Sequence, residues 1–216
     1  MGILLLLPFL LTACSGSSAI PTPLAEIEGT AEHAYDQALA SDYAGLSADA
    51  STLDSAWAGF RARAAADGGP TEVLVLMDEA IAGLASAAAD QPNHTDLELA
   101  RAANAISGPM DELFALYDDP VPAAVLALDY GGREVSIDAL EDGLGDALAD
   151  IGELESTWAG VKQQVLDTGA DGEAASYDTS LATQADLATA GDAAGLLAES
   201  NHGLELVDAM EAVFTK

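Results

Sequence analysis

The chain has 216 residues, with 37 Asp and Glu against six Lys and Arg, and its formal net charge at pH 7 is −31. A charge of this size and sign argues against nucleic acid or an anionic membrane surface as a partner, and leaves cations and basic partners open. The acidic residues are scattered along the chain, which is typical of a solvated, self-repelling surface suited to a salty medium.

The N-terminal segment begins with an apolar run over residues 3–11. This run is too short to span a bilayer as a helix, which takes about 20 residues, and it is typical of the apolar region of a signal peptide. The alternative, a buried N-terminal helix, is disfavoured because the run continues into Ser, Gly and Pro without a helix cap. We therefore predict a signal peptide over residues 1–13.

Cys14 is the only cysteine in the chain, and it directly follows Leu11, Thr12 and Ala13. This tetrapeptide resembles the bacterial lipobox, although the resemblance covers only the N-terminus. It implies an exported protein of the cell envelope, in the periplasm or on the outer face, held on a lipid bilayer through an acylated Cys14. Residues 14–25 are small, polar and proline-rich, which predicts a flexible tether.

Segments in the first half of the mature chain resemble segments in its second half, which indicates an internal repeat. Residues 52–60 match residues 153–161 at an offset of 101, and residues 110–117 match residues 207–214 at an offset of 97. The composition is rich in Ala and Leu with little alternation of apolar and polar residues, so helices are expected rather than strands. We predict an all-α fold of two tandem repeated four-helix up-down bundles, over residues 26–118 and 121–216, either separate or merged into one body.

Turn and cap residues divide each repeat into four predicted helices. The predicted helices cover residues 26–40, 43–67, 71–89, 96–118, 121–141, 143–167, 171–190 and 192–215. In the second helix of each repeat, apolar residues recur at steps of three and four and include Trp57 or Trp158, which predicts a packing seam.

The first candidate binding site is on the helix expected over residues 121–141. Arg133 is expected on a stripe that faces the bundle seam, with Asp129 one turn away, and Glu134 is within reach of Tyr130 at the same spacing. These four residues predict a ligand site in which Arg133 holds a carboxylate or another anion. The alternative is an internal ion pair, with Gly131 and Gly132 marking a kink or a close approach of helices.

The second candidate is a metal site that recurs in both repeats. Its proposed ligands are Asn104, Asp111, Asn201, His202 and Asp208. Oxygen ligands of this kind suit a divalent cation such as Ca²⁺ or Mg²⁺, and an imidazole extends the choice to transition metals. The alternative is a set of solvated side chains that recur only because the sequence is duplicated.

No nucleotide-binding, metalloprotease or serine-hydrolase motif occurs in the sequence, so we do not expect an enzyme. We expect an envelope lipoprotein that binds a small ligand, a cation or a partner protein at the seam between its repeats. The alternative is a structural or assembly scaffold of the envelope without a small-molecule ligand. A polar pocket around Arg133 favours the first, and an exposed apolar patch favours the second.

Overall fold

The computed structural model describes residues 19–215, which fold into α helices with one short 3-10 turn and no β strand. The prediction of an all-α fold is confirmed. The predicted signal peptide and Cys14 lie outside the described residues. The helices are α1 (Thr22–Leu39), α2 (Tyr43–Ala66), α3 (Thr71–Ala89), η1 (Gln91–Asn93), α4 (Asp96–Asn104), α5 (Met110–Phe114), α6 (Ala123–Leu140), α7 (Leu144–Asp167), α8 (Asp171–Ala190) and α9 (Ala193–Phe214).

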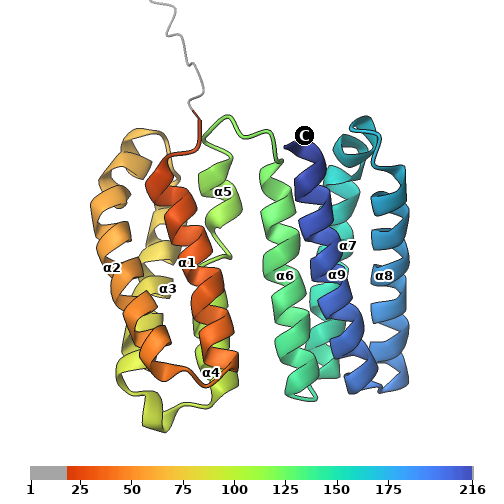
Figure 1. The fold of residues 1–216 in the computed structure, drawn as a ribbon, viewed down its shortest axis with the longest axis horizontal. Helices are drawn as coiled ribbons and strands as arrows, with labels where there is room; N and C mark the ends of the chain where they lie inside the picture. The colour runs from red at the N-terminus through yellow and green to blue at the C-terminus, as the bar shows by residue number, and fades with distance from the viewer. Residues whose placement is uncertain (1–18, 216) are drawn as a thin grey trace, which may run out of the picture.

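The helices form two sets that lie side by side (Figure 1). In the first bundle, α1 packs against α2 and α4, and α3 packs against α2 and α4. In the second bundle, α6 packs against α7 and α9, and α8 packs against α7 and α9. Each bundle has its own apolar core, but Ile137 of α6 belongs to the core of the first bundle. The two bundles therefore meet along α6, which also contacts α4 and α5.

Matching contacts recur in the two bundles. The indole nitrogen of Trp57 donates a hydrogen bond to Asp78, and that of Trp158 donates one to Asp178, both at 2.7 Å. Both indole rings are buried on the apolar stripe of their helix, at the positions that the spacing of three and four predicts. The sequence-derived duplication stays a prediction, but these contacts give equivalent positions for comparing the bundles.

Two predicted boundaries are wrong. Helix α1 begins at Thr22 and buries Leu24, so the segment predicted as a tether over residues 14–25 already includes the first turn of the helix. The prolines at 21 and 23 do not prevent this, because the first turn of a helix needs no backbone N–H donors.

The helix predicted over residues 96–118 is interrupted. Helix α4 ends at Asn104, residues 105–109 form turns, and α5 is a separate short helix. Gly108 and Pro109 explain the break, because a residue before proline is disfavoured in the helical conformation and proline cannot donate a backbone hydrogen bond. In the second bundle, α9 runs on without interruption over 22 residues.

Candidate functional site

Two glycines of α6 let its neighbours approach closely. A Cβ atom on Gly131 would lie 2.8 Å from Cδ2 of Leu154 in α7, and one on Gly132 would lie 2.7 Å from Cδ2 of Leu204 in α9. Helix α6 stays continuous through both glycines, so they mark a close approach of helices rather than a break. This tight packing fixes the position of the next residue, Arg133.

Arg133 lies between the two bundles and is 8% exposed. Its Nη2 donates to the carboxylate of Asp129 at 2.6 Å, one turn away, and also to the carboxylate of Glu32 in α1. Its guanidinium carbon lies 5.9 Å from the ring centre of Tyr35. The predicted pairing with Asp129 is present, whereas Glu32, which is 101 residues away, was not predicted as a partner.

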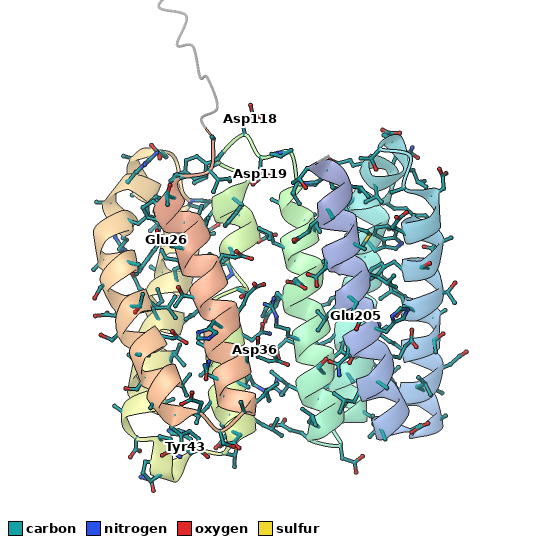
Figure 2. The ribbon with its side chains drawn as sticks, in the orientation of Figure 1. Glu26, Asp36, Tyr43, Asp118, Asp119 and Glu205 are labelled. Atoms are coloured by element: carbon teal, nitrogen blue, oxygen red, sulfur yellow. The ribbon has the colours of Figure 1, made fainter. Side chains whose placement is uncertain are left out.

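Carboxylates outnumber Arg133 around this position. A cleft of about 170 Å³ opens beside it and is lined by Glu32, Asp36, Asp129, Arg133, Leu204 and Asp208; we call it the inter-bundle cleft. Within the described part of the chain, Arg133 is the only cationic side chain that lines this cleft. Figure 2 shows side chains, Asp36 among them, between α1 and the second bundle. The cleft is therefore negative overall.

Burial and mutual repulsion raise the pKa values of the carboxyl groups around Arg133. Burial raises the pKa of Asp129 to about 8, with a smaller contribution from its hydrogen bond with Glu32 and with Arg133 opposing the shift. Burial raises the pKa of Glu28 to about 7, helped by the charges of Glu32 and Glu211. Burial likewise raises the pKa of Glu211 to about 7. Part of this cluster therefore holds protons at neutral pH.

The other two predicted ligand residues face a different side of α6. Glu134 accepts hydrogen bonds from Arg101 and, at 2.7 Å, from Nδ2 of Asn104, and Tyr130 contributes only its backbone oxygen, to the same Asn104 amide at 3.1 Å. The predicted grouping of Asp129, Tyr130, Arg133 and Glu134 into one site is wrong. Residues 133 and 134 are about 100° apart around a helix, so their side chains reach different neighbours.

Arg101 organises this second side of α6. Its Nη2 donates to Asp138 at 2.7 Å and to Glu141 at 3.0 Å, in addition to its contact with Glu134. Among the described residues, Oδ1 of Asn104 and Oδ2 of Asp138 are buried and accept no hydrogen bond from an N–H group or a hydroxyl. Burial, followed by the charge of Asp138 and a hydrogen bond to it, raises the pKa of Asp150 to about 7. A protonated Asp150 can thus donate a hydrogen bond to the Asp138 carboxylate.

The residues proposed as metal ligands are not brought together. Asn104 is buried against α6, while Asp111 belongs to another helix and bonds the backbone N–H of Glu112 at 2.7 Å. His202 lines a groove between α8 and α9, whereas Asp208 lines the inter-bundle cleft. Over residues 19–215, no group of three or more His, Cys, Asp or Glu side chains has a geometry that holds a metal ion. The predicted two-fold metal site is wrong, because the helix break separates Asn104 from Asp111, and on the unbroken α9 His202 and Asp208 line different cavities.

The sequence analysis also missed two carboxylates that pair with arginines of this region: Glu32, which pairs with Arg133, and Asp138, which pairs with Arg101. One signal was available: in a chain with six Lys and Arg, each cation that reaches the interior must be paired with carboxylates.

No protein-family model matches the chain, and neither a curated protein nor a solved structure matches it. None of the helices within residues 19–215 has both the length and the apolar composition that crossing a membrane requires.

Proposed function

We propose that this protein is a non-enzymatic, lipid-anchored protein of the cell envelope that binds a small organic cation in the inter-bundle cleft. The observation that carries the proposal is the charge of the cleft, where four carboxylates and a single guanidinium line a volume of about 170 Å³ between the bundles. An ammonium group entering this cleft replaces protons and relieves repulsion between carboxylates that are partly removed from water.

The charge of the cleft favours a cation over the anion predicted from Arg133. The guanidinium is already bound by Asp129 and Glu32, and an anion would have to compete with both and with the charges of Asp36 and Asp208. An organic cation is favoured over a bare metal ion because no metal-binding cluster occurs in residues 19–215. Leu204 adds an apolar wall for the carbon chain of an alkylammonium ligand.

The location in the envelope is supported by the lipobox-like tetrapeptide ending at Cys14. In this proposal the diacylglycerol on Cys14 is the membrane anchor, and α1 begins eight residues further along the chain, at Thr22. The helical body would then stay close to the bilayer surface, where it can take up cationic ligands from the envelope space.

Calorimetric titration with spermidine, and separately with Mg²⁺, tests the proposal at about 0.15 M salt, where long-range attraction is screened beyond about 8 Å. The double variant Asp36→Asn and Asp208→Asn removes two open carboxylates of the cleft, and we expect it to weaken spermidine binding about tenfold. The matched control, Glu26→Gln and Asp186→Asn, removes the same charge from exposed positions, one on α1 and one on α8. Glu26 is labelled in Figure 2. We expect the control to bind as the unaltered protein does.

Equal weakening of spermidine binding in both double variants would mean that spermidine responds only to net charge, and would refute the assignment of the binding site to the inter-bundle cleft. Binding of Mg²⁺ without any binding of spermidine would refute the proposal that the ligand is an organic cation. Binding should also weaken from pH 8 to pH 5.5, because the carboxyl groups of Asp129, Glu28 and Glu211, whose pKa values are about 7 to 8, then hold protons.

The alternative is a scaffold of the envelope without a small-molecule ligand. A largely apolar groove between α3 and α4 of the first bundle favours it. This groove is compatible with cation binding, because it shares no lining residue with the inter-bundle cleft.

A further inference from the structure

Each bundle has a groove between its third and fourth helices. The first groove, of about 550 Å³, runs between α3 and α4, and we call it the α3/α4 groove. Its lining includes Leu76, Ala80, Gly83, Ala102 and Ala105. The corresponding α8/α9 groove has a volume of about 480 Å³. Its lining includes Ser176, Ser180, Thr183, Glu199 and His202.

These two sets of residues occupy equivalent positions. The Trp–Asp contacts relate Asp78 to Asp178, an offset of 100, which carries Leu76, Ala80 and Gly83 onto Ser176, Ser180 and Thr183. In the fourth helix the offset is 97, so Ala102 corresponds to Glu199 and Ala105 corresponds to His202. The same architecture therefore has an apolar groove in one bundle and a hydrophilic groove in the other.

The fold itself does not require the α3/α4 groove to be apolar. Leu76 is 52% exposed and its neighbour Val75 is 41% exposed. Apolar surface left in water forgoes about 25 cal/mol for each square ångström. At the positions that correspond to Leu76 and Ala80, the α8/α9 groove has an exposed Ser176 and a buried Ser180. An apolar lining at positions where the other bundle has serine and threonine suits a groove that receives an apolar surface.

The break in the fourth helix contributes to the lining of this groove. Past Asn104 the chain turns at residues 105–109, and α5 packs against α6. Gly108 and Pro109 line the groove at the break, together with Tyr130 of α6. A Cβ atom added to Gly83 would meet no atom within 4 Å, so a side chain at this position would enter open space.

We propose that the α3/α4 groove binds an amphipathic helix of a partner protein, with an apolar stripe flanked by Lys or Arg. The small side chains of Ala80, Gly83 and Ala102 allow the backbone of a helix to approach closely, as ridges and grooves of packed helices require. Glu79 and Glu112 also line the groove and would pair with basic flanks. A second copy of the chain is disfavoured as the occupant, because each copy carries a net charge of −31.

A synthetic peptide of about 14 residues, or four helical turns, provides the probe. It carries Leu at helical spacing and Lys elsewhere, and binding is followed by fluorescence anisotropy on the whole protein at about 0.15 M salt. A peptide of the same composition in scrambled order, without an apolar stripe, controls for attraction by charge alone. We expect the amphipathic peptide to bind at least about tenfold more tightly than the scrambled one.

Two pairs of variants locate the site. Gly83→Trp fills the groove and should weaken binding about tenfold or more, whereas Thr183→Trp, its equivalent in the α8/α9 groove, should leave binding unchanged. Leu76→Gln should weaken binding severalfold, and its matched change Ser176→Gln should not. Because Leu76 is half exposed, this second pair stays informative if the tryptophan variants are poorly folded.

Three results would overturn the proposal. They are the absence of binding by the amphipathic peptide, equal binding of the scrambled peptide, and equal effects of the changes at positions 83 and 183. If light scattering instead detects a dimer of the unaltered protein that dissociates in Gly83→Trp, this result would show that a second copy of the chain occupies the groove, and would refute the proposal that the occupant is a basic helix of a partner protein.

Discussion

Replacing Arg133 by Met should destabilise the protein in a manner that depends on pH. Arg133 is 8% exposed, and its partners Asp129 and Glu32 come from both bundles. Removing one partner of a buried ion pair leaves charge without compensation, which costs up to about 3–5 kcal/mol. Because Arg133 lowers the pKa values of Asp129 and Glu28, its removal makes their ionisation more costly, and we expect a loss approaching this size at pH 8.

At pH 5 the same replacement should cost less, about 1–3 kcal/mol, the range for leaving a buried polar group without its hydrogen bond. The reason is that Asp129 and Glu28, whose pKa values are about 8 and 7, then hold protons and carry no charge. A carboxyl group whose pKa is higher in the folded state than in the unfolded state binds its proton more tightly when the protein is folded. Its contribution to stability is fully present below the pKa of the unfolded state, near 4, and is lost as the pH rises through the pKa of the folded state. The unaltered protein should therefore also lose stability between pH 5 and pH 8, and the variant should lose more.

Urea denaturation followed by tryptophan fluorescence measures both losses, because Trp57 and Trp158 place one buried reporter in each bundle. Arg63→Met is the control, since Arg63 pairs with Asp67 on the surface at 3.2 Å and such pairs contribute about 0–1 kcal/mol. An equal loss at pH 5 and pH 8 for Arg133→Met would refute the reasoning, because it would mean that the neighbouring carboxyl groups do not titrate in this window.

Three further outcomes are expected. Gly132→Ala should destabilise the protein by about 1–3 kcal/mol, because the added Cβ would lie 2.7 Å from Cδ2 of Leu204. Gly160→Ala, in open space on α7, should stabilise the protein by about 0.5–1 kcal/mol. Thermal unfolding of both variants measures the two effects. Cys14→Ser should move the protein from the membrane fraction to the soluble fraction, and a variant that stays with the membranes would contradict the lipid anchor. The melting temperature should rise with added salt, because screening weakens repulsion in a chain of net charge −31, and a flat or falling profile would count against this surface interpretation.

Local pattern was enough to predict the helices. Trp57 and Trp158 lie on stripes with steps of three and four, and both are buried where the stripe places them. Such a pattern depends only on the pitch of the helix and on the gain from burying apolar surface, and both can be read within about 20 residues of sequence. The break at residues 105–109 also has a local signal, Gly108 followed by Pro109, which the predicted helix over residues 96–118 did not take into account.

The candidate site depended on contacts that no local pattern contains. The sequence placed Asp129 beside Arg133, since one helical turn separates them, but only the tertiary structure brought Glu32 of the other bundle to the same guanidinium and turned Glu134 away toward Arg101. The charge of the inter-bundle cleft, and hence the preference for a cation over an anion, follows from which carboxylates the two bundles bring together.

The sequence by itself determined the all-α class, most helix boundaries and the acidic surface, because helix periodicity and net charge are properties of the chain alone. Only the tertiary structure decided that α6 joins the two bundles, that Arg133 is enclosed by carboxylates, and that equivalent grooves differ in polarity. These features depend on which side chains meet across helices that are far apart in the sequence, and such meetings are fixed by packing.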